Sequence, residues 1–275
     1  DPFNILLLAG FIGFFMAFGI GANDVANSMG TSVGSKAITI KQAIIIAAIF
    51  EFLGAFLAGG EVTSTIRKGI VDPNLYANDV NIFVIGMISA LLAGGTWLFI
   101  ASLRGWPVST THSIVGAIIG FVLISKGVDA VSWGKVGNIA MSWVTSPLFS
   151  GTLAFGLYIS AKKLILDRAN PGKAAITFIP LYSFLVAVVI SLVTARKGLK
   201  HVGIEFSENE IYLFTLIFSI IVATGTAFFL RRNKDQIMRE GGIEFAFGLL
   251  MIVSASAMAF AHGSNDVANA IGPLA

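Results

Sequence analysis

The chain has 275 residues, of which 56% are hydrophobic and only 12% are charged, and its mean hydropathy is +0.85. About a quarter of the residues of a soluble globular protein are charged, so this composition indicates a membrane protein. The lack of cysteine excludes disulfide frameworks, thiol nucleophiles and iron–sulfur centres. The net charge of +3 does not favour a nucleic-acid partner, because basic residues in short loops orient membrane helices.

Apolar runs of about 20 residues recur along the chain, and a helix of this length crosses about 30 Å of hydrocarbon. Lipid offers no partners to backbone N–H and C=O groups, so such runs are expected to be helices. The sequence therefore predicts an all-α, polytopic protein of the cell membrane. The expected runs lie near residues 3–22, 43–60, 82–101, 106–125, 139–160, 175–194, 211–230 and 243–262.

A pattern of fifteen residues occurs near both ends of the chain. Residues 16–30 read MAFGIGANDVANSMG and residues 258–272 read MAFAHGSNDVANAIG, which agree at ten positions. A match of this kind indicates an internal repeat. The apolar runs place seven crossings between the copies, an odd number, so the copies are expected to enter the membrane from opposite sides. Inverted repeats are typical of secondary transporters, whose sites lie at the repeat interface.

Each copy of this signature carries an aspartate between two asparagines. Residues three and four apart share a face of a helix, and an aspartate at the bilayer centre costs about 2.5–3.5 kcal/mol, so a partner is expected. Carboxylate, amide and main-chain oxygens suit Na⁺, and Gly21, Gly30 and Gly34 are expected to let the helix break and present such carbonyls. The alternative is that the polar residues only cap a helix. The candidate cation ligands are Asn23, Asp24, Asn27, Asn265, Asp266 and Asn269.

A second polar stretch, GWPVSTTHSIVGAIIG from residue 105 to 120, lies inside an apolar run. Pro107 cannot continue a helix, so a helix is expected to begin just after it. Its first turn would contain Ser109, Thr110 and Thr111, where free N–H groups and the helix dipole favour an anion. These three hydroxyls are the candidate ligands of a tetrahedral oxyanion; the alternative is that Ser109 or Thr110 is only a cap. Under the binding interpretation the segment is a re-entrant hairpin or a broken helix.

Two isolated ionisable side chains leave alternatives open. Ser109 and His112 are three apart, but a hydrolase also needs an orienting acid and an oxyanion hole, so no catalytic residue is assigned and no enzyme is expected. His112 is expected to form a local hydrogen bond, with proton coupling as the lesser alternative. Glu51 lies within an apolar run, either along a cation route or in a structural pair.

The stretches GANDVANSMGTSVGSKA, GWPVSTTHSIVGA and AHGSNDVANAIGPLA, in this order, resemble the inorganic phosphate transporter (PiT) family, which includes sulfate permeases. The resemblance implies phosphate uptake coupled to Na⁺ or H⁺, with no other cofactor. It implies a cation region at the signature residues and phosphate contacts from the three hydroxyls. The family carries a second Ser-Thr-Thr hairpin after the second signature, and none precedes Ala275, so truncation of a longer protein is expected.

These features together predict a secondary transporter that imports inorganic phosphate with a cation, Na⁺ in the first place, by alternating access. A sulfate permease is the nearest alternative, because both anions are tetrahedral. An anion channel is a different class, and it should show a continuous polar stripe along several helices instead of two polar breaks. The expected partners are phosphate, sodium ions and the lipid bilayer, and a homodimer is one permitted assembly.

The predicted organisation along the chain has three parts. Residues 1–160 form the first repeat, with its signature at 19–36 and its anion-binding hairpin at 105–125. Residues 161–242 supply connecting membrane helices and basic loops, and residues 243–275 begin the second, inverted repeat.

Overall fold

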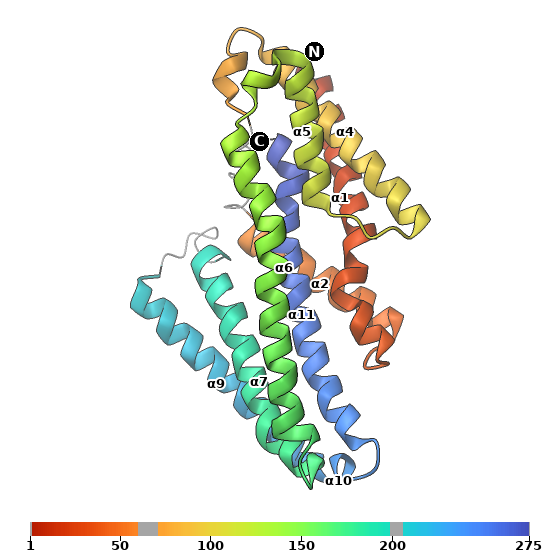
Figure 1. The fold of residues 1–275 in the computed structure, drawn as a ribbon, viewed down its shortest axis with the longest axis vertical. Coiled ribbons are helices and arrows are strands. Elements are labelled where there is room, and N and C mark those ends of the chain that lie inside the picture. The colour runs from red at the N-terminus through yellow and green to blue at the C-terminus, as the bar shows by residue number, and fades with distance from the viewer. Residues whose placement is uncertain (1, 60–70, 199–205, 275) are drawn as a thin grey trace. The chain divides into compact units, whose positions relative to one another are not determined.

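The computed structural model describes residues 2–59, 71–198 and 206–274, and every regular element in these ranges is helical. The predicted all-α class is therefore confirmed. One-turn 3-10 segments lie at Pro73–Tyr76, Val128–Ala130 and Gly272–Leu274, and π-helical turns at Lys162–Leu166 and Thr194–Gly198. The helices, labelled in Figure 1, are α1 (Pro2–Gly34), α2 (Ile40–Ala58), α4 (Val80–Arg104), α5 (Thr110–Lys126), α6 (Trp133–Ala161), α7 (Pro171–Val193), α9 (Glu208–Arg232), α10 (Lys234–Ile237) and α11 (Gly242–Ile271).

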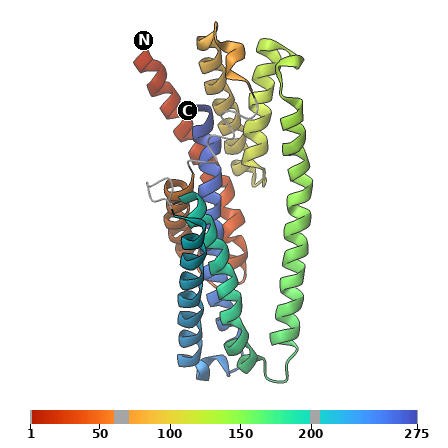
Figure 2. The same cartoon turned by 90° about the vertical axis from the view of Figure 1, so that its left-hand side faces the viewer.

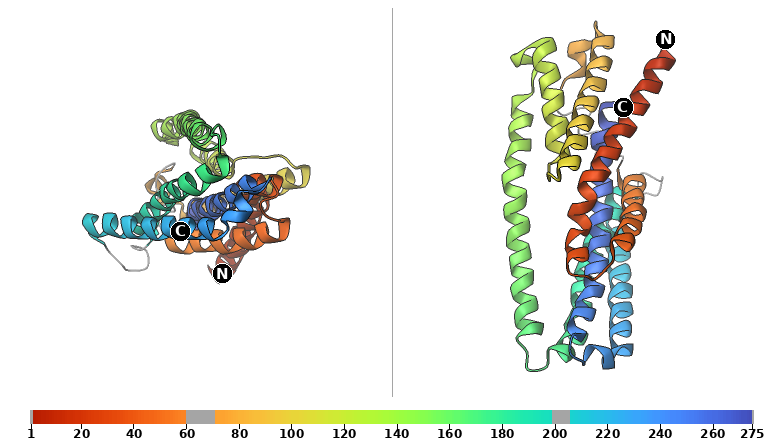
Figure 3. Two further views of the ribbon diagram at one scale, coloured as in Figure 1. Left: turned by 90° about the horizontal axis from the view of Figure 1, so that it is seen from below. Right: turned by 90° about the vertical axis from the view of Figure 1, so that its right-hand side faces the viewer.

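Seven of the described helices are long and apolar enough to cross a membrane. The fourth apolar run differs from the sequence-based count, because it forms the shorter helix α5 of 17 residues, which returns alongside α4 (Figures 2 and 3). The count of eight crossings is thus corrected to seven long helices and one short one in the described ranges. The run was overcounted because Trp106, Pro107 and Val108 are apolar but precede the helix.

The helix break expected at the signature glycines is wrong. Helix α1 runs without interruption through Gly21 and Gly30 and ends at Gly34, and α11 continues unbroken past Asn265. Glycine permits a break but does not require one, and every intact backbone hydrogen bond keeps a polar group satisfied in lipid. The signatures therefore offer side chains, not freed carbonyls, to a ligand.

The chain divides by its internal packing into two compact units. Unit 1 consists of residues 1–28, 49–139 and 260–275, and unit 2 of residues 29–48 and 140–259. Both sets of signature residues and the whole α4–α5 pair belong to unit 1. The candidate cation and anion ligands thus lie in one compact body, although they come from opposite ends of the sequence.

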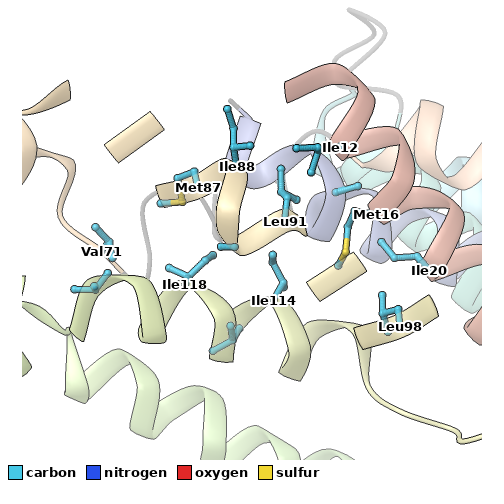
Figure 4. Packing of buried hydrophobic residues seen from close by; sticks show 14 of the residues in the cluster. Ile12, Met16, Ile20, Val71, Met87, Ile88, Leu91, Leu98, Ile114 and Ile118 are labelled. Carbon is cyan, nitrogen blue, oxygen red and sulfur yellow. The ribbon is translucent and has the colours of Figure 1, made fainter. Parts of the chain in front are cut away.

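The core of unit 1 is an apolar cluster contributed by α1, α4 and α5 (Figure 4). The cluster includes Met16 of α1, Leu91 and Leu98 of α4, and Ile114 and Ile118 of α5, and each of these side chains is at most 1% exposed. The spacings of four and seven residues place the buried side chains on one face of each helix. Between membrane helices such contacts stabilise through van der Waals packing, because lipid is as apolar as the side chains themselves.

Polar contacts fasten the end of the α4–α5 pair where α4 begins. The hydroxyl groups of Tyr76 and Ser125 lie 2.6 Å apart. Lys126 forms an ion pair with Asp79, with Nζ and Oδ2 3.1 Å apart, and its ammonium lies 5.0 Å from the centroid of the Tyr76 ring. A hydrogen bond, an ion pair and a cation–π contact therefore join the end of α5 to the residues just before α4.

At the other end of the pair the chain leaves α4 and enters α5 through a short extended segment. Gly105 ends α4 in the left-handed conformation, with φ of 66°. Ser109 is the N-cap of α5, and its Oγ accepts a hydrogen bond from the His112 N–H at 3.3 Å. The predicted helix start just after Pro107 is confirmed, and it places Thr110 and Thr111 in the first turn of α5.

Unit 2 is organised by the antiparallel pair of α7 and α9, which lie side by side in Figures 1 and 2. Small polar side chains, Ser183 and Ser191 on α7 and Ser219 and Thr226 on α9, are buried. Small residues let helix backbones approach closely, which is the usual basis of helix association in lipid. A capping box begins α9, in which Ser207 and Glu210 satisfy each other's backbone N–H groups.

Two glycines allow α2 and α11 to cross closely within unit 1. A Cβ atom on Gly263 would meet the backbone of Glu51, and one on Gly54 would meet the backbone of α11. Beside this crossing, Ser264 Oγ donates to the Ala58 carbonyl oxygen at 3.4 Å. The crossing therefore depends on hydrogen atoms at positions where any other residue has a side chain.

The substitution Gly263→Ala should lower the melting temperature of the purified protein, because overpacking against backbone costs about 1–3 kcal/mol. Gly120→Ala on α5 is the matched control, since nothing lies within 4 Å of a Cβ atom there. Alanine is favoured over glycine in a helix by up to about 1 kcal/mol, so this control should be as stable as the parent or more so. Thermal unfolding in detergent, followed by circular dichroism, tests both; a Gly263→Ala variant as stable as the control would contradict the packing argument.

Candidate functional site

On α1 the first signature places Asn23 and Asp24 in the interior and Asn27 at the surface. Asn27 Nδ2 donates to Asp24 Oδ1 at 3.3 Å, a contact between residues one turn apart. Asn23 reaches the segment before α5, where its Nδ2 donates to the Trp106 carbonyl at 3.1 Å and its Oδ1 accepts from the Val108 N–H at 3.3 Å. Of the three side chains that the spacing groups together, two pair with each other and one contacts the hairpin.

On α11 the burial of the two signature asparagines is reversed relative to α1. Asn265 is exposed, whereas Asn269 is 1% exposed and Asp266 is buried. Asn269 Nδ2 donates to Asp266 Oδ1 at 3.2 Å, which repeats the contact of Asn27 with Asp24. The two copies thus share their internal geometry and differ in which asparagine is covered.

The hydroxyl groups of Thr110 and Thr111 on α5 contact the amide group of Asn269. Its Nδ2 lies 3.3 Å from Thr110 Oγ1 and 3.2 Å from Thr111 Oγ1, and Thr110 Oγ1 lies 3.5 Å from Asp266 Oδ1. An amide nitrogen has two protons, and Nδ2 of Asn269 has three acceptors within reach. It can therefore change from one acceptor to another and still make two hydrogen bonds. The candidate anion ligands Thr110 and Thr111 therefore touch the candidate cation ligands of α11, whereas Ser109 is exposed and caps α5.

Asp24 and Asp266 are both buried in unit 1. Both line a cavity of about 460 Å³ in unit 1, with Glu51 and His262 also on its wall. Oε1 of Glu51 and Nδ1 of His262 are buried and have no hydrogen-bond partner among the described residues. Like charges that share a buried site oppose each other's ionisation unless a cation or proton lies between them, so the cavity favours a positively charged ligand.

Sequence reasoning singled out Glu51 and left its role open, and His262 was not among its candidate residues. The structure brings both to the cavity of Asp24 and Asp266. For His262 no spacing signal was available, because the equivalent position in the first copy is Ile20. Among the described residues no group of three or more histidine, cysteine, aspartate or glutamate side chains is assembled for a metal ion. The donors at the site are carboxylate, amide and hydroxyl oxygens.

Comparison with protein-family models matches residues 20–275 to the phosphate transporter family. The chain belongs to this family. The match begins at Ile20, within the first signature, and extends past the second. The family predicted from the signature stretches is therefore confirmed. Together with the seven long apolar helices, membership also confirms a multi-pass membrane protein of a transporter family, not an enzyme family.

Individual relatives in the phosphate transporter family align along nearly the whole chain. A protein of Haemophilus influenzae, provisionally named a phosphate permease, is 52% identical over 95% of this chain and 63% of its own length. The inorganic phosphate transporter 2-1, chloroplastic, of Arabidopsis thaliana is 40% identical over 96% of this chain and 48% of its own. A solved structure named the sodium-dependent phosphate transporter has a TM-score of 0.91 and 39% sequence identity. The match covers 99% of this chain and 66% of that structure's chain. The chain thus spans about half to two thirds of the length of these relatives.

The substitutions Asn269→Ala and Asn27→Ala form a matched pair at equivalent positions of the two signatures. Asn269→Ala should lower the melting temperature more, because it removes an amide donor shared by two buried or half-buried hydroxyls and a buried carboxylate, and an unsatisfied buried group costs about 1–3 kcal/mol. Asn27 is exposed and donates only to Asp24 in the described contacts. Unfolding of both variants should be measured without phosphate or sodium, and equal losses would show that the described network does not stabilise the site.

Proposed function

We propose that this member of the phosphate transporter family imports inorganic phosphate together with Na⁺ by alternating access. The observation that carries the proposal is the contact of Asn269 with Thr110 and Thr111 on one side and Asp266 on the other. It brings anion-binding hydroxyls and cation-binding oxygens within one hydrogen-bond network. The name of the structural relative, a sodium-dependent phosphate transporter, supports both the ion and the substrate.

The cation would bind between the two signatures. Asp24 and Asp266 supply the negative charge, and Asn27 and Asn269 use their Nδ2 atoms in the described bonds, which leaves their Oδ1 atoms for coordination. Asn265 lies beside Asp266 and completes the proposed region, whereas the amide group of Asn23 is already bonded to the segment before α5. Carboxylate and amide oxygens suit a hard cation such as Na⁺. The coupling ion is therefore assigned to side chains of both copies.

Phosphate would bind at the first turn of α5. Ser109, Thr110 and Thr111 offer hydroxyl donors there, beside N–H groups that have no partner inside the helix and the positive end of its dipole. An anion this close to Asp266 would be repelled by the carboxylate. Two like charges about 4 Å apart oppose each other by about 4 kcal/mol at an effective dielectric constant of about 20. A bound cation would remove this repulsion, which couples phosphate binding to sodium.

The directions of the signature helices support alternating access. Within unit 1 the first signature lies on the part of α1 that runs away from the N-terminus, downward in Figure 1, and the second on the part of α11 that runs upward to the C-terminus. Transporters built from oppositely oriented repeats expose a shared central site to each side of the membrane in turn. The proposed site, formed by residues of both copies, has the composition that this mechanism requires.

Sulfate is the second candidate substrate, because hydroxyl and N–H donors accept any tetrahedral oxyanion. One observation favours phosphate: Asp266 Oδ1 lies 3.5 Å from Thr110 Oγ1, so a carboxylate acceptor borders the proposed anion position. Phosphate keeps a proton near neutral pH and can donate it to a carboxylate, whereas sulfate has none to donate. The same carboxylate would oppose free passage of anions, which argues against a channel.

Uptake of radiolabelled phosphate by the full-length protein in liposomes tests the proposal, with Na⁺ and proton gradients imposed separately. Uptake is expected only with an inward Na⁺ gradient, and excess sulfate should compete weakly. Phosphate uptake driven by a proton gradient alone would show that the coupling ion is H⁺ and not Na⁺. Phosphate flux without either gradient would indicate a channel. Uptake of sulfate in preference to phosphate would contradict the assignment of phosphate as the substrate.

Asp24→Asn and Asp266→Asn should each abolish sodium-driven uptake while the protein remains folded. Each substitution keeps the size of the side chain and removes a negative charge from the wall of the shared cavity. A cation is stabilised there chiefly by these charges. Uptake at several sodium concentrations, compared at equal amounts of reconstituted protein, gives the readout, and unchanged sodium dependence in both variants would remove these aspartates from the cation site.

Replacing Ser109, Thr110 and Thr111 together by alanine should abolish phosphate binding. Alanine is compatible with the first turn of α5, and each lost hydroxyl removes a donor worth about 1.5–3 kcal/mol when it bonds to a charged group. Isothermal titration with phosphate at saturating sodium measures the loss. The single variant Ser109→Ala should lose less, because Ser109 already caps α5; titrations unchanged in the triple variant would leave these residues a purely structural role.

A further inference from the structure

We infer that Asn23 is a positioning residue: it holds the extended segment from Trp106 to Val108 and thereby places the first turn of α5 against α11. This role differs from that of a cation ligand, to which the signature spacing assigns it. The predicted effect on phosphate rests on the proposed function, whereas the effect on the segment itself does not.

The segment between α4 and α5 has backbone groups that no helix satisfies. Asn23 Nδ2 donates to the Trp106 carbonyl at 3.1 Å, and its Oδ1 accepts from the Val108 N–H at 3.3 Å. Between these two residues Pro107 has no N–H to offer. A primary amide carries a donor and an acceptor side by side, so one side chain satisfies the backbone on both sides of the proline, as a neighbouring strand would.

The environment of Asn23 supports a fixed orientation of its amide group. The residue is 8% exposed, and its Nδ2 has a third, longer contact to Ser102 Oγ at 3.5 Å near the end of α4. Nδ2 and Oδ1 are thus both occupied by the α4–α5 hairpin. Asn27 differs, because its amide nitrogen pairs with Asp24 on the same helix and its side chain is exposed.

The position of this segment bears directly on the candidate anion ligands. Only Ser109 separates Val108 from Thr110, and Ser109 caps the helix that Thr110 begins. The contacts of Thr110 and Thr111 with Asn269 measure 3.3 and 3.2 Å. Hydrogen bonds weaken steeply beyond such distances, so a small shift of the segment would separate the hydroxyls from α11.

The second signature provides a natural comparison. Asn265 occupies the position equivalent to Asn23, and it is exposed with a 3.5 Å contact to Asp266. It has no described contact with the segment from Trp106 to Val108, although both asparagines begin the same sequence NDVAN. The two hydrogen bonds of Asn23 to Trp106 and Val108, here called the clamp, therefore depend on the position of Asn23 in unit 1 and not on the motif.

Amide hydrogen exchange, measured on the full-length protein without sodium or phosphate, tests the clamp directly. Asn23→Ala should raise the exchange rate of the Val108 amide, because its acceptor is lost. Asn265→Ala is the matched control and should leave exchange at Val108 unchanged. Equal exchange of Val108 in the parent protein and in Asn23→Ala would overturn the inference.

Ligand dependence separates positioning from cation ligation. In Asn23→Ala the phosphate concentration for half-maximal uptake should rise about tenfold, the factor expected from loss of two ordinary hydrogen bonds. The sodium concentration that half-maximally raises the melting temperature, measured without phosphate, should stay unchanged. Loss of this sodium effect would make Asn23 a ligand and overturn the inference. Ser102→Ala, which removes only the longest contact, should resemble the parent protein.

Asn23→Asp keeps the test decisive if the alanine variant does not fold. An aspartate retains the acceptor for the Val108 N–H but cannot donate to the Trp106 carbonyl. Positioning predicts weaker phosphate uptake with unchanged sodium stabilisation, whereas a cation ligand that gains a charge should bind sodium more tightly, which would overturn the inference. A parent protein without sodium-driven phosphate uptake would refute the proposed function, and the exchange of Val108 would still decide the clamp.

Discussion

The candidate site depends on one electrostatic constraint, the burial of Asp24 and Asp266 around a single cavity. Two carboxylates cannot both stay charged in such a place without a compensating ligand. Amide donors from Asn27 and Asn269 provide part of the compensation, and Thr110 adds a weaker contact. Under the proposed function, the remaining negative charge would attract a cation, and it would repel an anion until the cation is bound.

The α4–α5 hairpin connects the two signatures through different groups. Its extended segment contacts Asn23 on α1, and the first turn of its second helix contacts Asn269 on α11. A displacement of the hairpin would therefore change the surroundings of both signature helices at once. This arrangement gives a physical route by which occupation of the anion position and occupation of the cation position can depend on each other.

Close helix packing places two further ionisable side chains at the same cavity. Because Gly263 has no side chain, α2 can approach α11 until the backbone of Glu51 lies against it. Glu51 and His262 then line the cavity, and each has a buried atom without a hydrogen-bond partner in the described part of the chain. Unpaired polar atoms in an apolar surrounding are costly, so their presence here fits a cavity that accommodates a ligand.

The sequence by itself determined what depends on neighbouring residues: the long apolar helices, the repeated signature, and the start of α5 after Pro107 with Ser109 as its cap. Hydropathy, helical periodicity and proline chemistry act within a few residues, so a pattern of letters reveals them. Only the tertiary structure decided that the signature helices stay unbroken, that Asn23 contacts a segment 85 residues away, and that Asn269 contacts Thr110, 159 residues away. Two copies of one motif have the same local preferences, and what distinguishes Asn23 from Asn265 is the packing of the rest of unit 1 around them.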